Sequence, residues 1–314
     1  MLRFVTKNIG VAVVQIFVVA TIVFLLLRFM PGDPVLLVLG TERGADPVAV
    51  AEMRATLGLD QPLITQYFGW ITDIARMDFG QSLFNNIDVT AYIAERLPKT
   101  LELAIAAIII GSVIGIFLGI VAAVRRGSFV DFIVSTIAAA GMAFPVYVTG
   151  TAFILLISLQ LNLLPASGYT DFSEDPVAHF KRLLLPAITI ALPLAASIAR
   201  MTRSSMLEVL GKDFVQTLRA KGLSEKLVVY KHVLRNAIIS VITVIGLELA
   251  NLIGGTVLIE FLFNWPGLST LLVDSINNRN YPIIQGSIIV IAAFYILINR
   301  TVEVIYGLMD PRTR

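Results

Sequence analysis

Long apolar runs separated by polar segments dominate the pattern of this chain. Six runs are each long enough to cross a hydrocarbon core of about 30 Å, which takes about 20 residues in a helix. Backbone N–H and C=O groups find no water in lipid, so we expect each run to be helical. The sequence predicts six spans, at about residues 8–30, 99–124, 130–160, 183–207, 236–262 and 285–308.

The first run has two interpretations. Arg3 and Lys7 precede it, as basic residues precede a secretory signal peptide. The run is longer than a typical signal core, however, and it ends without a small-residue cleavage pattern. We therefore interpret it as an uncleaved first span.

The longest polar region, residues 31–98, follows the first span. Asp46 and Pro47 have the pattern of a helix start, and Gly58 has the pattern of a helix end. A further short helix is expected over residues 89–97, leading to Pro98. The region thus predicts an insertion of short helices.

Residues 63–77 in this insertion have apolar positions at helical spacing. They predict an amphipathic helix that lies on the membrane or packs on the bundle. The apolar positions are Leu63, Tyr67, Trp70, Ile71, Ile74 and Met77.

A second polar segment, residues 208–235, is basic and separates the fourth and fifth spans. Asp213 is placed to N-cap a short helix through Thr217 and Arg219, and Gly222 is placed to end it in the left-handed conformation. Ser224 is placed to cap the helix that continues into the fifth span. Such a segment is typical of an ordinary solvated loop, and also of a knob that docks on a cytoplasmic partner. Without a resemblance to guide the choice, the pattern favours the ordinary loop.

Composition places the chain among polytopic membrane proteins. Hydrophobic residues make up 57% of it, charged residues 15%, and the mean hydropathy is +0.84. Soluble domains are about 45–50% apolar and about 25% charged. The net charge of +2 gives no argument for nucleic-acid binding, and the absence of cysteine excludes disulfides and thiolate sites. His179 and His232 lie far apart in sequence, so no His-rich metal site is predicted.

Positive charge predicts the orientation. The N-terminus, the loop 125–131, the segment 200–235 and the C-terminal tail are rich in Lys and Arg, and six spans place them on one side. By the positive-inside rule that side is the cytoplasm, so both termini are expected there. The acidic region 31–98 is then expected outside, with the loops 161–182 and 263–284.

Catalytic motifs are missing from the sequence. It has no phosphate-binding loop, no H-E-x-x-H, no G-x-S-x-G and no G-x-G-x-x-G. We therefore predict that the chain is not an enzyme and holds no metal or cofactor.

Polar and small residues inside the spans suggest contacts and a pathway. Gly111, Gly115 and Gly119 form a small-xxx-small face for close helix packing. Glu248 lies near the centre of the fifth span with Asn251 one turn on, and it either lines a solute pathway or holds helices together; the two readings are equally supported.

Two further features of the spans are less specific. Phe144, Pro145 and Tyr147 lie within the third span, where the proline either kinks the helix beside a solute or simply packs. Glu260, near the outer end of the fifth span, is predicted to be interfacial.

Several stretches together resemble a known family. They are MPGDP (30–34), LGLDQPLITQY (57–67), DFGQS (78–82), LRAKGLSEKLVVYKHVLRNA (218–237), FNWPGLSTLLVDSINNRNYPIIQG (263–286) and MDPRTR (309–314). In this order the chain resembles the B-type membrane permease subunits of bacterial peptide- and nickel-type ABC importers. The resemblance implies an all-α, six-transmembrane-helix permease bundle with a cytoplasmic coupling helix and a periplasmic insertion of short helices.

The resemblance implies that the coupling helix lies within residues 212–223 and enters a groove on an ATP-binding subunit. The peptide-type pattern R-A-K-G and H-x-L-R-N-A is present from Arg219 to Gly222 and from His232 to Ala237. Against the broader importer pattern, Gln216, Thr217 and Leu218 replace E-A-A, His232 replaces an isoleucine, and Arg235 replaces a proline. The residues implied in coupling are Asp213, Thr217, Arg219, Ala220, Lys221, Gly222, His232 and Arg235.

The resemblance also implies the partners. Two ATP-binding subunits would bind ATP and Mg, and a solute-binding protein would dock near residues 31–98. A second, related permease subunit is expected, although a homodimer stays open. The complex would import peptides, nickel chelates or similar small solutes across the bacterial cytoplasmic membrane by alternating access.

Two other functions compete with this reading. A proton-coupled secondary transporter would use Glu248 as its proton site. A membrane-embedded enzyme or scaffold is disfavoured by the absent motifs. If the chain is an importer permease, the candidate residues of the substrate pathway are Phe144, Tyr147, Glu248 and Asn251.

Overall fold

A computed structural model describes residues 2–28, 35–36, 39, 46–56 and 58–309 of the protein. Within these residues every extended regular element is helical, and the one β-bridge joins Gln81 to Asp88. The all-helical, polytopic prediction is confirmed. The α-helices are α1 (Leu2–Arg28), α3 (Pro47–Thr56), α4 (Leu63–Ala75), α5 (Val89–Val124), α6 (Phe129–Ala143), α7 (Val146–Phe153), α8 (Pro176–Leu210), α9 (Asp213–Ala220), α10 (Glu225–Leu227), α11 (Leu234–Gly255), α12 (Val257–Leu262), α13 (Leu268–Asn277) and α14 (Tyr281–Met309). Two π-helical segments, Ile154–Gln160 and Val228–Val233, continue α7 and precede α11.

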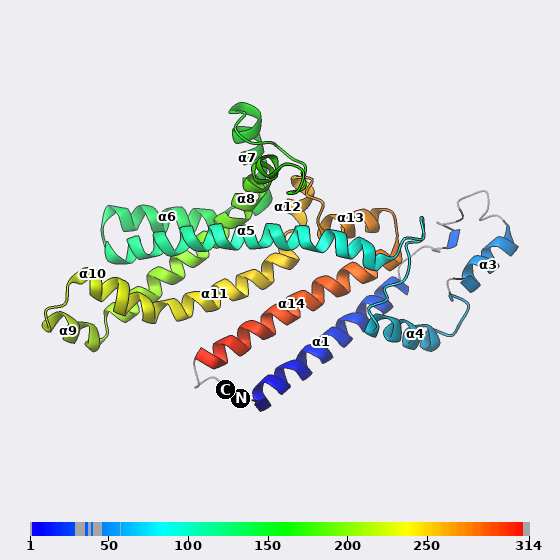
Figure 1. The fold of residues 1–314 in the computed structure, drawn as a ribbon, viewed down its shortest axis with the longest axis horizontal. Coiled ribbons are helices and arrows are strands. Elements are labelled where there is room, and N and C mark those ends of the chain that lie inside the picture. Colours follow the sequence, from blue (N-terminus) through cyan, green and yellow to red (C-terminus); the bar gives the residue numbers. More distant parts are fainter. Residues whose placement is uncertain (1, 29–34, 37–38, 40–45, 57, 310–314) are drawn as a thin grey trace.

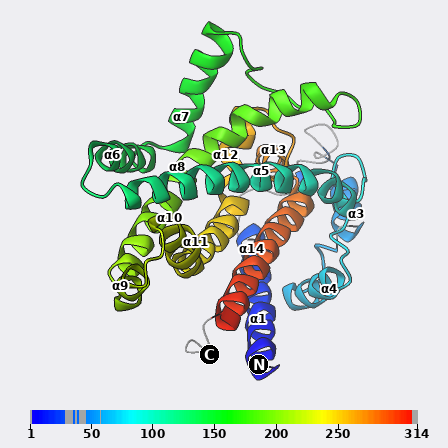
Figure 2. The same ribbon diagram turned by 60° about the vertical axis from the view of Figure 1, so that its left-hand side comes forward.

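Helices long and apolar enough to cross a membrane form the body of the molecule. Among the described residues there are five, in α1, α5, α8, α11 with the turns before it, and α14, or six if the bent pair of α6 and α7 counts as one span. They overlap the six predicted spans. Figures 1 and 2 show the helices of the body side by side, with α9 and α10 at one end of the molecule and α3 and α4 at the other.

The short helix expected over 89–97 is not separate. It forms the first turns of α5, which continues through Pro98. Proline removes one backbone donor and usually ends or kinks a helix. Here Val89 and Ile93 are buried against Leu268 and Ile283, so packing with α13 and α14 holds these turns in line.

The third predicted span, 130–160, is broken. The axes of α6 and of α7 with its π-helical continuation differ by 102°. Phe144 lies between them with extended dihedrals, φ −85° and ψ 133°. A residue before proline avoids the helical region, so Pro145 accounts for a break rather than a mild kink.

The glycine face predicted on α5 packs against α8. A Cβ on Gly115 would lie 2.7 Å from the Ala195 carbonyl oxygen, and one on Gly119 would lie 2.6 Å from that of Ala199. No side chain fits at these distances, so the two backbones approach as closely as small residues permit. The prediction of a close helix contact is confirmed.

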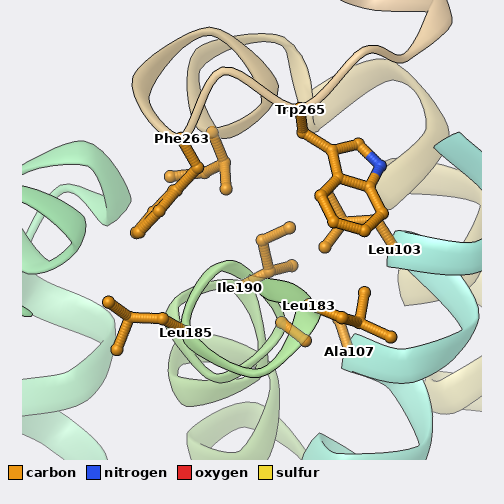
Figure 3. Packing of buried hydrophobic residues seen from close by; sticks show 9 residues of the cluster. Leu103, Ala107, Leu183, Leu185, Ile190, Phe263 and Trp265 are labelled. Atoms are coloured by element: carbon orange, nitrogen blue, oxygen red, sulfur yellow. The ribbon is translucent and has the colours of Figure 1, made fainter. Parts of the chain in front are cut away.

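A hydrophobic core joins α5, α8 and the segment after α12. Figure 3 shows Phe263 and Trp265 facing Leu103 of α5 and Ile190 of α8. The Trp265 indole is fully buried, and its Nε1 donates to the Lys99 carbonyl oxygen at 2.9 Å. This core fixes the FNWPGL segment onto the bundle.

The polar insertion contains the helix boundaries that the sequence predicts. Asp46 Oδ1 accepts from Val48 N at 2.9 Å at the start of α3, and Gly58 has φ +63° after its end. The amphipathic helix is α4, whose Tyr67 and Trp70 pack on Phe24 of α1. These contacts place α4 against the bundle, which is one of its two predicted positions. The motif MPGDP and residues 310–314 of MDPRTR lie outside the described residues.

Candidate functional site

The loop between α8 and α11 contains the short helix that the sequence predicts. Lys212, and not Asp213, occupies the N-cap position, with φ −79° and ψ 147°. Asp213 is the first helical residue, and the predicted capping bond is absent. The backbone explains the shift by one residue. Lys212 N bonds to Val209 O at 3.1 Å in the turn that ends α8, and Lys212 itself has the extended dihedrals of a cap, so the new helix begins at Asp213. The Asp213 carboxylate remains in the first turn, where the helix dipole favours negative charge.

The predicted end of this helix is confirmed at Gly222. Its φ is +77°, its N–H bonds to the Arg219 carbonyl oxygen at 2.9 Å, and Leu223 N bonds to Leu218 O at 3.3 Å. Ser224 occupies the N-cap position of α10 as predicted, but its side chain makes no capping hydrogen bond. Two short helices therefore meet at a tight left-handed turn.

One side of α9 is anchored in the protein. Val215 is fully buried among Met206 and Val209 of α8 and Val228 and Val233 of the segment before α11. Leu218 packs against the same cluster. Burial of these side chains stabilises the position of α9 by roughly 1.5–3 kcal/mol for each large aliphatic group.

The other side of α9 is open. The predicted coupling residues in this stretch are all exposed: Asp213, Thr217, Arg219, Ala220, Lys221 and Gly222. Phe214 is 39% exposed on the same helix and was not among the predicted coupling residues. An aromatic residue in a short, mostly polar helix between two spans was the signal for it in the sequence.

An ion pair closes the turn after α9. Arg219 Nε donates to Glu225 Oε2 at 3.0 Å, and Arg219 Nη2 donates to Glu225 Oε1 at 2.6 Å. The bond to the carboxylate raises the pKa of the Arg219 guanidinium further above its usual value. The two helices are thus joined both by the backbone turn and by a bidentate side-chain contact.

The two remaining predicted coupling residues lie beyond this turn. His232 is half-buried in the π-helical segment, at the junction of loop and helix that the resemblance implied. Its carbonyl oxygen accepts from Asn236 Nδ2 at 2.7 Å. Arg235 is exposed on the first turn of α11. Their roles in coupling stay predictions.

Glu248 and Asn251 line one cavity of about 320 Å³. Ser197 Oγ of α8 donates to Glu248 Oε1 at 3.0 Å. Phe144 and Tyr147 are exposed and do not line this cavity, although their neighbours Met142 and Val146 do. The structure thus brings two of the four candidate pathway residues together.

Buried polar contacts between distant segments were not predicted. Glu260, expected at the membrane interface, is fully buried in the protein. Its Oε1 accepts from Thr100 Oγ1 at 2.7 Å, and its Oε2 accepts from the backbone N–H groups of Ser269 (3.0 Å) and Thr270 (3.1 Å). Thr100 and Glu260 are 160 residues apart, and no sequence pattern indicates their contact.

Two more such contacts involve α8. Arg203 makes a bidentate pair with the buried Asp131 of α6, with Nε–Oδ1 2.6 Å and Nη2–Oδ2 2.9 Å. The buried ring of His179 contacts Glu102 Oε1 through Nε2 at 2.6 Å and the Thr170 carbonyl oxygen through Nδ1 at 2.8 Å. Within the described residues, no group of three or more His, Cys, Asp or Glu side chains is arranged to hold a metal ion.

Known proteins resemble this chain over its whole length. Residues 115–314 match the family described as "Binding-protein-dependent transport system inner membrane component", and residues 1–104 match the description of its N-terminal part. The di/tripeptide transport system permease protein DppB of Pseudomonas aeruginosa is 40% identical over 334 aligned residues, with 100% of this chain and 99% of the relative covered. The dipeptide transport system permease protein DppB of Escherichia coli is 38% identical over 340 aligned residues, with the same coverage.

A solved structure agrees with the fold. The MetNI methionine ABC transporter in its inward-facing conformation has a TM-score of 0.57 and 18% identity, covering 69% of this chain and 96% of that chain. At this identity the likeness concerns the fold alone. The family matches confirm a transport subunit that is not itself an enzyme, and they do not support the proton-coupled alternative. The chain belongs to the family of binding-protein-dependent transport system inner membrane components, the permease subunits of ABC importers.

Proposed function

We propose that this chain is one of two related permease subunits in an importer of peptides, and that α9 is the element that couples it to an ATP-binding subunit. ATP and Mg bind to two such partner subunits. A solute-binding protein docks on the outer side, near residues 31–98. The chain lies in the bacterial cytoplasmic membrane with both termini in the cytoplasm.

The observation that carries this proposal is the two-sided character of α9. Val215 anchors one side in the bundle, while Phe214, Thr217 and Lys221 present an apolar and polar surface on the other. A loop that only connects two spans does not need a buried anchor or a bidentate clamp. A docking knob needs both, because a partner can move the bundle only through a rigid contact.

The connections of α9 give the coupling a physical route. The helix joins the end of α8 to the segment that leads into α11, and both α8 and α11 line the cavity of Glu248 and Asn251. A displacement of α9 by a closing partner therefore moves two walls of that cavity. ATP and the outer binding protein bias the populations of inward- and outward-open states.

Peptides are the proposed solute class. The two relatives described above are named as transport proteins for dipeptides and tripeptides, and they align with this chain from end to end. The B-type resemblance of the sequence motifs favours the same class. The second permease subunit is expected to be a related chain.

Cysteine chemistry tests the docking role, because the natural chain contains no cysteine. Ala220→Cys is expected to cross-link to a single cysteine in the groove of the ATP-binding subunit. In intact cells, the same cysteine is expected to resist a membrane-impermeant maleimide, whereas Asn278→Cys in the loop predicted outside is labelled. Labelling of position 220 from outside would refute the proposed topology and docking role together.

Energy coupling is tested in liposomes with the complete importer. The purified chain alone is expected to hydrolyse no ATP, and peptide uptake is expected to stop when the partner ATPases are inactivated. An uncoupler is expected to leave uptake unchanged. Uptake that survives ATPase inactivation but collapses with an uncoupler would contradict the proposal.

A further inference from the structure

A carboxylate lies in a cavity beside two helix breaks and a proline inside a third helix. The cavity of Glu248 is lined by Met142 and Val146 on either side of the break between α6 and α7, and by Gly255 and Ile259 on either side of the break at Thr256. Pro193 of α8 lines it as well. Interrupted backbone at membrane depth is tolerated where it is buried in protein or lines a cavity, and transporters place solute sites at such points.

The proline inside α8 also removes one backbone donor beside the cavity. Pro193 has no N–H and so supplies no hydrogen bond to the carbonyl of Thr189, one turn before it. The other lining side chains are mostly aliphatic, among them Ile190, Leu194 and Leu252. The cavity is therefore mostly apolar, with the polar side chains of Ser197, Glu248 and Asn251 in its lining, as is typical of small-molecule sites.

The Glu248 carboxylate is the charged group of this cavity. Within the part of the chain that the structure describes, its hydrogen-bond partner is Ser197 Oγ, and no Lys or Arg forms an ion pair with it. The side chain is half-buried, and the amide of Asn251, one turn along α11, is exposed. A carboxylate in such surroundings is favourable only if it meets a cation or water.

We propose that Glu248, with the Asn251 amide beside it, binds the α-ammonium group of the transported peptide. This inference rests on the proposed function. A permease that carries peptides of differing side chains has to recognise what they share, and the N-terminal ammonium is one such group. An ammonium group has three N–H donors, and the Glu248 carboxylate and the Asn251 amide oxygen can accept from them. Hydrogen bonds from an ammonium to a carboxylate are stronger than those between neutral groups.

The site can be tested without any variant. The complex of the permease pair and the ATP-binding subunits is purified in detergent, with the binding protein omitted, and solute contact is measured by saturation-transfer NMR. Dialanine is expected to receive saturation, whereas N-acetyl-dialanine, which lacks the ammonium, is expected to receive at least about tenfold less at equal concentration. Equal signals from both peptides would overturn the inference.

Variants then assign the site to a residue. Glu248→Gln is expected to lower the dialanine signal to the level of the acetylated peptide, and Glu248→Asp, which keeps the charge, to retain part of it. Glu303→Gln removes a different carboxylate from a span and is expected to leave the signal unchanged. A dialanine signal in Glu248→Gln equal to that of the natural chain would overturn the inference, and so would an equal loss in Glu303→Gln.

Uptake separates this inference from the proposed function. In liposomes with the binding protein, Glu248→Gln is expected to import dialanine at least about tenfold more slowly while the binding protein still stimulates ATP hydrolysis. If the natural complex imports no peptide at all, the proposed function fails. If it imports dialanine and Glu248→Gln does so equally fast, only the ammonium site fails.

Discussion

Arg219 and Glu225 form a bidentate ion pair across the left-handed turn at Gly222, with N–O distances of 3.0 and 2.6 Å. One residue lies in the last turn of α9 and the other begins α10. The pair therefore fixes the angle between the exposed helix and the segment that leads into α11. Both side chains are largely exposed, so the contact concerns geometry more than stability.

This pair gives the first prediction. Arg219→Ala is expected to change the free energy of unfolding by less than about 1 kcal/mol, because exposed ion pairs contribute little. It is expected to raise the amount of ATP hydrolysed per peptide imported, since α9 is then less rigidly held. The charge-reversed double variant, Arg219→Glu with Glu225→Arg, is expected to restore that ratio in part. A reversed pair no better than the single variant would show that Arg219 acts by another contact.

Gly222→Asp is expected to uncouple ATP hydrolysis from uptake while the protein still inserts. The φ of +77° costs an L-residue roughly 1–2 kcal/mol, and the new carboxylate would lie on the proposed docking surface. Gly127→Asn is the control for a side chain at positive φ without the added charge, because Gly127 has φ +76° and equally open space around an added Cβ. Uptake and ATP hydrolysis are measured in liposomes for both. If the Gly222→Asp variant imports peptide at the rate of the natural chain, that result would argue against docking at this turn.

Replacing glycine by alanine is expected to lower stability inside the contact between α5 and α8 but not outside it. Gly115→Ala is expected to lower stability by about 1–3 kcal/mol, because the Cβ would lie 2.7 Å from the Ala195 carbonyl oxygen. Gly10→Ala in α1 meets nothing within 4 Å and is expected to be neutral or stabilising by up to about 1 kcal/mol. Thermal unfolding in detergent, followed by size-exclusion chromatography, measures both. Equal melting temperatures would contradict the close packing.

Glu260→Gln is expected to loosen α13. The carboxylate accepts the backbone N–H groups of Ser269 and Thr270, and an amide nitrogen in place of Oε2 would leave buried donors without an acceptor. An unsatisfied buried donor costs about 1–3 kcal/mol. Hydrogen exchange over residues 263–277 is expected to become faster in this variant.

Asp274→Asn provides the control for this experiment. Asp274 lies on the same helix, but its side chain is exposed. Its substitution is expected to leave exchange over the segment unchanged. If both variants exchange at the natural rate, Glu260 does not hold the start of α13.

The sequence by itself determined much of this protein, because several of its features depend on local rules. The lengths of the apolar runs require helices in lipid, whatever their partners. Gly222 and Gly58 end helices because a residue without Cβ adopts positive φ without strain. The glycines of α5 mark a close contact because their spacing places them on one face. The motif order was sufficient to recognise the family.

Tertiary structure decided what depends on residues far apart in the chain. Pro98 and Pro145 look alike in sequence, yet α5 continues through the first because α13 and α14 pack on it, while the chain breaks at the second. Glu260 is buried because Thr100 and the start of α13 supply its donors from elsewhere. Glu248 gained a cavity because the break between α6 and α7 and the break at Thr256 lie around it, opposite α8. Local pattern sets where helices can form, but long-range packing selects which polar groups face one another, and that selection leaves no signal in a single sequence.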